Sequence, residues 1–370
     1  MKSKTTTFSK YKSFEEYLGL MHRKAVEILQ NLNENDRKYA NMFFEKYYPA
    51  EKEHYWSLKK LYSLAMFIPM FLQIGLKAKK RKLFNEIIYV DTHAGPGLAK
   101  VGPHEKDIVL GSPLLSLEWP GVVAGRVKSF SKINVGFDKY FFIERDYRTY
   151  ALLKKIVNTY YTGKNVEVLH GDSNKIVPII KKKVEKKKPL ILLFIDPYGE
   201  LDSQLEYTAL NEILSIDAVD VVFNVMSPYI SRGLMGMKKS ISSFRECVDR
   251  LWGPVCKDRE SLLYKMSINF GSRICECYHM EDLSKCVIGI NDILAMYELL
   301  LRLRNYNFVD FVPVEYKGHI LYHLMFASKS KGARTWLGNY IKYLRGKAPK
   351  DYATLRSLWL KATGRLSTLF

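Results

Sequence analysis

The sequence predicts an α/β fold in which a doubly wound, mostly parallel sheet ends in an antiparallel hairpin. Five short apolar segments, rich in β-branched and aromatic residues, alternate with helical patterns and cover 87–91, 140–144, 166–169, 190–196 and 219–225. Runs that are apolar at successive positions are typical of strands buried on both faces of a parallel sheet. Two further strand-like runs, 308–316 and 319–328, are joined by Lys317-Gly318, which predicts the hairpin.

The chain divides into five parts by pattern. We expect an N-terminal helical region (1–85), a core of five strands (86–236), a helical insertion (237–308), the end of the core with the hairpin and a helix (309–345), and a basic tail (346–370). Apolar residues recur at helical spacing in 14–29 and 51–76, and the basic run 77–82 is expected to separate the second helix from the first strand. The charge-free stretch 61–76 is shorter than the roughly 20 residues of a membrane span. It is therefore interpreted as a buried helix.

The composition indicates a folded and strongly basic protein. Hydrophobic residues make up 47% of the 370, which excludes a disordered chain. Lys and Arg number 58 against 38 Asp and Glu, a net charge of +20. Such an excess favours a polyanionic partner. We expect nucleic acid as the partner and no membrane partner; on charge alone an acidic membrane surface ranks second, and a basic surface without a specific partner is the remaining alternative.

The first dozen residues are polar and basic, so no signal peptide is predicted and a cytoplasmic protein is expected. All five cysteines lie between Cys247 and Cys286, and their spacing matches no zinc pattern. No metal site is predicted, and buried free thiols are expected. The scarcity of glutamine is typical of thermophiles, in which an intracellular disulfide is a less improbable alternative.

Polar residues follow the predicted strands where a cofactor would bind. A glycine-rich turn after the first strand brings backbone N–H groups close to a ligand, and in a doubly wound sheet the strand ends line one crevice. Glu144, which ends the second strand, can accept both ribose hydroxyls of a nucleoside, and Asp172, after the third, can accept an adenine amino proton. The predicted cofactor-binding residues are Asp91, Thr92, His93, Ala94, Gly95, Gly97, Glu144, Asp172 and Ser173.

Asp196-Pro197-Tyr198-Gly199 ends the fourth strand and is the candidate catalytic segment. Enzymes that methylate an exocyclic amino group place a short Asp/Asn-Pro-aromatic segment here: the acidic or amide group orients the amino group, and the ring stacks on the base. Asp196, Pro197 and Tyr198 are the predicted catalytic residues. The alternative is an ordinary turn after a buried strand.

Several separated motifs resemble the three-Cys-motif partner family, TcmP. They are Trp56 with Lys60-Leu61, YVDTHAGPG (89–97), GSPL (111–114), FIERD (142–146), GD (171–172), FIDPYG (194–199) and YHLMFAS (322–328). The resemblance implies a class I fold that binds S-adenosylmethionine (SAM), and a partner protein that is radical-SAM-like and bears a three-cysteine motif. The Asp-Pro-aromatic-Gly variant is also similar to tRNA N2,N2-guanine dimethyltransferases. It lacks the second proline of adenine-N6 enzymes, which puts adenine in doubt as the target.

Two hypotheses for the function follow. The first is a SAM-dependent methyltransferase acting on an exocyclic amino group of a base in RNA or DNA. The second is a non-catalytic, methyltransferase-like module that binds nucleic acid and a partner protein. Under the first hypothesis, residues 237–308 and the basic tail are expected to grip the nucleic acid. From Lys331 onward, aromatics alternate with cations and are expected to stack on bases, unless they pack this part of the chain onto the core: Trp336, Tyr340, Tyr343, Tyr352 and Trp359.

Overall fold

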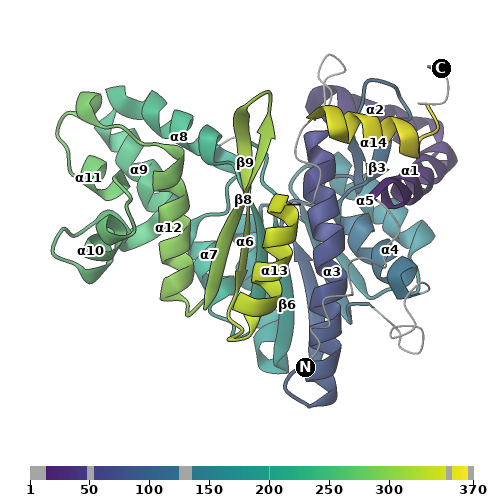
Figure 1. Cartoon of the computed structure of the whole chain (residues 1–370), viewed down its shortest axis with the longest axis horizontal. Helices are drawn as coiled ribbons and strands as arrows, with labels where there is room; N and C mark the ends of the chain where they lie inside the picture. Colours follow the sequence, from purple (N-terminus) through teal and green to yellow (C-terminus); the bar gives the residue numbers. More distant parts are fainter. Residues whose placement is uncertain (1–13, 48–53, 125–135, 200, 347–351, 366–370) are drawn as a thin grey trace.

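A computed structural model describes residues 14–47, 54–124, 136–199, 201–346 and 352–365 (Figure 1). Its centre is a seven-stranded sheet in the order β5-β4-β1-β6-β7-β9-β8, parallel except for β9, which runs antiparallel to both neighbours. This confirms the predicted fold class, and it is a methyltransferase-like sheet topology. The strands are β1 (Glu86–Asp91), β4 (Lys139–Glu144), β5 (Val166–His170), β6 (Pro189–Ile195), β7 (Val219–Val225), β8 (Phe308–Tyr316) and β9 (His319–Ser328).

The central strands are apolar at almost every position because both faces of the sheet are covered. Ile87 and Tyr89 of β1 contribute to the core on one face, while Ile88 and Val90 contribute to the core on the other. The first face is covered by α1 (Phe14–Asn31), α3 (Trp56–Lys80), α4 (Ser112–Ala124), α5 (Tyr147–Tyr160) and α13 (Ala333–Gly346). The second is covered by α6 (Ser173–Val184), α7 (Tyr207–Leu214) and α8 (Ser227–Gly236).

Helix α3 is a core helix that crosses one face of the sheet (Figure 1). Among the described residues it is the one helix long and apolar enough to span a membrane, but 67% of its most apolar window is buried within the protein. The basic run predicted to lie between helix and strand is instead the last turn of α3 as far as Lys80. Lysine propagates a helix well, and cations are favoured at a helix C-terminus. Lys79 also pairs with Asp138 at 2.5 Å.

The helical insertion forms one end of the molecule, on the left of Figure 1. It comprises α9 (Ile241–Trp252), α10 (Leu262–Asn269), α11 (Ile274–Tyr278) and α12 (Ile290–Leu303). The expectation of free thiols is wrong for four of its five cysteines, because Cys256 is bonded to Cys275 and Cys277 to Cys286. Cys275 and Cys277 lie two positions apart on α11 and therefore point to different sides of this helix. Cys247 is free and buried.

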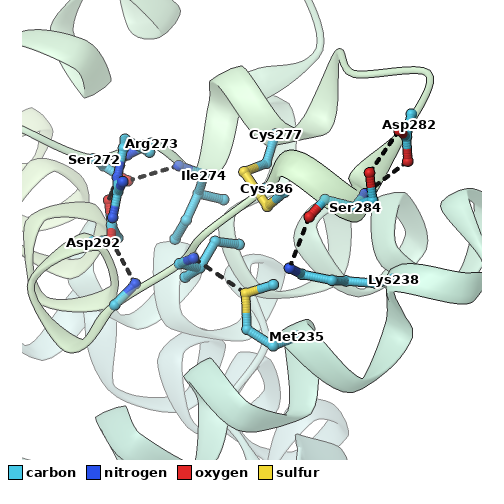
Figure 2. Close-up of a disulfide and its surroundings, with 12 residues drawn as sticks. Met235, Lys238, Ser272, Arg273, Ile274, Cys277, Asp282, Ser284, Cys286 and Asp292 are labelled. Atoms are coloured by element: carbon cyan, nitrogen blue, oxygen red, sulfur yellow. Dashed lines mark hydrogen bonds and ion pairs between the residues drawn. A yellow bond between two sulfur atoms is a disulfide. The ribbon is translucent and has the colours of Figure 1, made fainter.

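Figure 2 shows the Cys277–Cys286 disulfide, which joins α11 to the segment before α12. Asp282 caps the short helix that follows it by accepting from the backbone N–H of Ser284, whose carbonyl oxygen accepts from Lys238 at 3.4 Å. Further along, Asp292 accepts from the backbone N–H of Arg273 at 2.7 Å. The disulfides and these capping bonds together fix the short elements between α9 and α12.

The C-terminal residues pack onto the core rather than forming an open tail. Helix α14 (Tyr352–Ala362) lies against α1 and α3, and Trp359 is fully buried with its Nε1 donating to Asp107 at 3.3 Å. Tyr340 donates to the Ser63 carbonyl at 2.5 Å, and the Tyr343 hydroxyl lies 2.8 Å from that of Tyr62. The prediction that these rings stack on bases is therefore wrong for Tyr340 and Trp359. The side chain of Tyr352 and residues 347–351 lie outside the described residues.

Candidate functional site

A cavity of about 260 Å³ opens at the carboxyl edge of the sheet, where β1, β6 and β7 end. In Figure 1 this edge is at the top, between α2 (Glu34–Tyr47) and α8. The loop after β1 contributes one wall, the segment after β6 another, and α2 and α3 cover it from outside. Its lining residues include Tyr47, Trp56, Lys60, Gly95, Asp196, Tyr198, Asn224 and Tyr229.

Asp91, the last residue of β1, supports the glycine-rich loop that follows it. Its side chain is fully buried, and Oδ1 accepts from the backbone N–H of His93 at 3.2 Å. Burial raises the pKa of Asp91 to about 7, although a hydrogen bond from Ser112 favours the charged form. Thr92 is equally buried, and its hydroxyl donates to the Phe194 carbonyl of β6. These contacts fix the loop against two strands.

The two glycines of the loop face different surroundings. Both have positive φ, +61° at Gly95 and +80° at Gly97, which favours glycine. A Cβ at Gly95 would meet only the Tyr198 hydroxyl, at 3.5 Å, so this glycine faces the cavity. A Cβ at Gly97 would lie 2.7 Å from Leu114 and 2.9 Å from Leu153. Gly97 thus allows helix packing, whereas Gly95 leaves space for a ligand.

Glu144 ends β4 and is bound to the loop. Its Oε2 accepts from Gly95 N–H at 2.9 Å, and Oε1 accepts from Asp146 N–H at 2.8 Å. The residue is only 5% exposed, and burial raises the pKa of its carboxyl. Above it, Tyr39 of α2 donates to Asp146 at 2.7 Å. Helix α2 therefore lies over the end of β4 and shields Glu144 from solvent.

The residues after β5 lie beside the cavity without lining it. Asp172 caps α6 by accepting from Asn174 N–H at 2.9 Å, and the Ser173 hydroxyl donates to the Thr92 carbonyl. Of the predicted cofactor residues, the cavity is lined by His93, Ala94 and Gly95. It also brings these together with all three predicted catalytic residues, Asp196, Pro197 and Tyr198. Asp91, Thr92, Gly97, Glu144, Asp172 and Ser173 support the loop or the neighbouring strand ends.

His93 is fixed by two hydrogen-bonded contacts. Its Nδ1 lies 2.8 Å from the Thr92 hydroxyl, and its Nε2 lies 2.9 Å from the Ser203 carbonyl. Burial lowers the pKa of His93 to about 4. The ring is consequently neutral at pH 7 and links the loop after β1 to the segment after β6.

Asp196 is held by two side chains from distant parts of the chain. Lys60 Nζ of α3 donates to Oδ2 at 2.5 Å, and Asn224 Nδ2 of β7 donates to Oδ1 at 2.7 Å. Both partners line the same cavity. Asn224 is only 3% exposed, and its amide oxygen has no hydrogen-bond partner among the described residues. A buried acceptor without a donor is costly, and this one adjoins a cavity next to a carboxylate.

Aromatic rings form the walls and mouth of the cavity. Tyr47 stacks on Tyr198 with ring centroids 4.8 Å apart and an interplanar angle of 27°. Two rings at the mouth each carry a cation: Lys46 Nζ lies 4.9 Å from the Tyr47 ring, and the Arg232 guanidinium lies 4.6 Å from the Tyr229 ring. Rings with cations above them offer flat apolar surfaces beside positive charge.

Sequence reasoning did not assign Asn224, Tyr47 or Tyr229 to the site, and it used Lys60 only as part of a motif. Asn224 had one signal, since it is a polar residue near the end of an otherwise apolar strand, Val219–Val225. Tyr47 and Tyr229 had none, because tyrosines are frequent throughout the chain.

No known family matches the sequence, and no curated protein is similar to it at a significant level. The resemblance to the three-Cys-motif partner family therefore rests on the motifs alone. The sheet topology resembles that of class I methyltransferases, and this fold could suit SAM binding. Among the described residues, no group of three or more His, Cys, Asp or Glu side chains is arranged to hold a metal ion.

Proposed function

We propose that the chain is a SAM-dependent methyltransferase that acts on an exocyclic amino group of a base in RNA or DNA. Two observations support the proposed SAM dependence. They are the methyltransferase-like topology and Gly95, whose Cβ position opens into the cavity. Glu144 and Asp172 follow the strands at which the ribose and adenine of SAM would lie. The Glu144 carboxylate accepts backbone N–H groups of the glycine-rich loop and of the residues after β4, and two carboxylate oxygens together offer about four acceptor positions, so a ribose hydroxyl can be bound as well.

The observation that carries the proposal is the pair of acceptors at the end of the cavity. The carboxylate of Asp196 and the unpartnered amide oxygen of Asn224 belong to side chains joined by a 2.7 Å hydrogen bond. An exocyclic amino group presents two N–H donors from one nitrogen. Two adjacent acceptors match these donors, and they turn the nitrogen lone pair away from themselves and towards an electrophile.

Bound SAM would supply an electrophilic methyl group on a sulfonium. Asp196 and Asn224 orient the amino nitrogen, and Asp196 is placed to accept the proton that this nitrogen loses. Lys60, 2.5 Å from Asp196, fixes the carboxylate and balances its charge. The Tyr198 ring, backed by Tyr47, offers a stacking face to the base. The net charge of +20 and the ring–cation pairs at the mouth favour a polyanionic substrate.

A second function, a non-catalytic module that holds nucleic acid and a three-Cys-motif partner protein, is favoured by one observation. Both oxygens of Asp196 already have partners, Lys60 and Asn224. A site that never receives an amino group could keep these contacts as purely structural ones. Binding of nucleic acid without methyl transfer would be its signature.

One experiment distinguishes the two functions. The purified protein is incubated with total cellular RNA and DNA and with SAM labelled on its methyl group. Nucleoside analysis should find the label on an exocyclic nitrogen. Label on a ring nitrogen, a ring carbon or a ribose oxygen would contradict the amino-group assignment, and absence of label despite nucleic-acid binding would favour the second function.

A further inference from the structure

We propose that α5 and the end of β5 form a stacking platform for an unpaired base of the nucleic-acid substrate, separate from the cavity. The platform consists of Tyr147, Tyr150 and His170, with Lys154 beside Tyr150, and Arg148 follows Tyr147 in the same helix. It deepens the proposed function and rests on it, since it names how the substrate strand is held outside the site.

The three rings of the platform form a compact cluster on the surface. Tyr147 lies 6.1 Å from Tyr150 and 5.4 Å from His170, and Tyr150 lies 5.3 Å from His170, between ring centroids. Tyr147 is 65% exposed. An aromatic ring left largely in water contributes little to folding, but it offers a flat face to a stacking partner.

A cation contacts one of these rings. Lys154 donates to the Tyr150 hydroxyl at 2.9 Å, with Nζ 5.4 Å from the ring centroid. Helix α5, Tyr147–Tyr160, contains Arg148, Lys154 and Lys155 and no acidic residue. The preceding Asp146 caps the helix by accepting from Thr149 N–H at 2.8 Å. The side chains of α5 itself are therefore net positive, which favours a phosphate backbone, although Lys155 is paired with Asp36.

The platform lies at the same edge of the sheet as the cavity. Tyr147 begins α5 directly after β4, and His170 is the last residue of β5. Strands β5 and β6 are separated by β4 and β1, which at about 4.8 Å per strand places their ends roughly 14 Å apart. One strand of nucleic acid can thus contact the platform while a nearby nucleotide enters the cavity beside Asp196.

Exposed tyrosines lie both at the cavity and at the platform. Among the described residues, three aromatic side chains are exposed: Tyr47, Tyr147 and Tyr229. Tyr47 and Tyr229 line the cavity, and Tyr147 is on the platform. A hollow of about 530 Å³ beside it is lined by Tyr147, Tyr150, Ala151, Lys154, Lys155, Asn158 and Thr159. Rings with polar and cationic neighbours suit a base and its phosphates better than a lipid surface, which would favour aliphatic side chains beside the cations.

The test is binding of a fluorescent single-stranded oligonucleotide of mixed sequence, measured by anisotropy in the full chain without SAM. The double variant Tyr147→Ala/Tyr150→Ala should bind at least 5-fold more weakly, since stacking on one ring contributes roughly 5- to 100-fold. Tyr147→Phe should bind like the parent because the ring remains. Leu83→Ala, at a 59% exposed residue just before β1 and outside the parts of the chain expected to bind nucleic acid, is the matched control and should change nothing.

Charge is tested separately through salt. Arg148→Gln/Lys154→Gln should reduce the slope of log affinity against log salt by about 0.7 for each lost phosphate contact. Lys187→Gln, at a lysine 47% exposed just before β6 and so at the opposite edge of the sheet, should leave the slope unchanged. Binding to anionic phospholipid vesicles is measured for the same variants. If Tyr147→Ala/Tyr150→Ala binds vesicles more weakly than the parent but binds the oligonucleotide equally well, the rings form a membrane contact and the platform is overturned.

The outcomes separate this inference from the proposed function. If the parent binds the oligonucleotide and the folded tyrosine variant binds it equally well, the platform is wrong and the cavity chemistry is untouched. If the variant loses binding while the parent methylates no nucleic acid, the platform stands and the methyltransferase proposal fails. If Tyr147→Ala/Tyr150→Ala weakens SAM binding as well, the rings belong to the cofactor site and the platform is overturned.

Discussion

Lys60 Nζ lies 2.5 Å from Oδ2 of Asp196, although 136 positions separate the two residues. The contact joins α3, which precedes the first strand, to the segment after β6, and it places a cation beside the carboxylate in a site that is mostly shielded from water. The side chains are 15% and 16% exposed. An ion pair so shielded is expected to matter more than one at the surface.

A double-mutant cycle measures this pair. Lys60→Met should lower the free energy of unfolding by about 1.5–3 kcal/mol, because it leaves the carboxylate without its charged donor. Asp196→Asn alone should also destabilise, and the two changes together should cost less than their sum by about 1 kcal/mol or more. Urea denaturation of the four proteins gives the coupling. Lys265 and Glu260, 58% and 89% exposed, are the control pair and should couple by about 0.5 kcal/mol or less. Equal coupling in both pairs would contradict the account.

Alanine at Gly97 should mainly lower stability, whereas alanine at Gly95 should mainly weaken SAM binding. Gly97→Ala puts a Cβ against Leu114 and Leu153 at positive φ, so we expect a loss of stability of about 2 kcal/mol or more. Gly95→Ala should cost about 1 kcal/mol of backbone strain, and it should weaken SAM binding more strongly than Gly97→Ala does. Thermal denaturation and calorimetric titration with SAM measure both effects. If Gly95→Ala binds SAM as tightly as the parent, the cavity beside Gly95 is not the SAM site.

Asp220 should make stability decrease as the pH rises. Burial on β7 raises the pKa of its carboxyl to about 7, against about 4 in an unfolded chain. The folded protein therefore keeps a proton that the unfolded chain releases, so the stability that Asp220 contributes is fully present below pH about 4 and is lost as the pH rises towards 7. Asp220→Asn stays neutral and should become relatively more stable than the parent from pH 5 to pH 8. The comparison uses the difference in unfolding free energy between Asp220→Asn and the parent at each pH. Burial lowers the pKa values of His93 and His323 to about 4, so these two residues make stability increase with pH in both proteins. A difference independent of pH would show that Asp220 is charged in the folded protein.

The disulfides predict a thiol count that differs from the five cysteines of the sequence. Alkylation in denaturant without reductant should modify only Cys247, and prior reduction should expose all five. The Cys277→Ser/Cys286→Ser variant should lose about 2–3 kcal/mol, since the bond closes a short loop. Mass spectrometry counts the modified thiols. Five alkylated cysteines before reduction would restore the expectation of free thiols.

The strands of the sheet were predictable because strands buried on both faces are apolar throughout. The seven predicted segments agree with the observed strands to within one residue at each end. Helix α2 lies within the region expected to be helical, but no apolar spacing singled it out, because it buries only Ala40, Phe43 and Phe44. The hairpin of β2 (Leu98–Lys100) and β3 (Ile108–Leu110) is too short to show alternation.

The site was predictable only where residues follow strands directly. Sequence order places Gly95, Glu144 and Asp196 at one edge, since parallel strands share that edge. The contacts of Lys60 and Asn224 with Asp196 arise from tertiary packing, for which no local pattern exists. The disulfide pairing was equally hidden, because several pairings of five cysteines satisfy the same spacing.

The most direct measurement is the initial rate of methyl transfer from labelled SAM to nucleic acid by Asp196→Ala, compared with the parent at matched binding. The account predicts a loss of roughly 10²–10⁴-fold, the usual contribution of a group that orients a nucleophile and takes its proton. SAM and oligonucleotide affinities should be preserved, Tyr198→Ala should retain more activity than Asp196→Ala, and Tyr198→Phe should react almost like the parent. Full activity in Asp196→Ala would contradict the account, because the segment Asp196-Pro197-Tyr198-Gly199 would then be only the turn that ends β6.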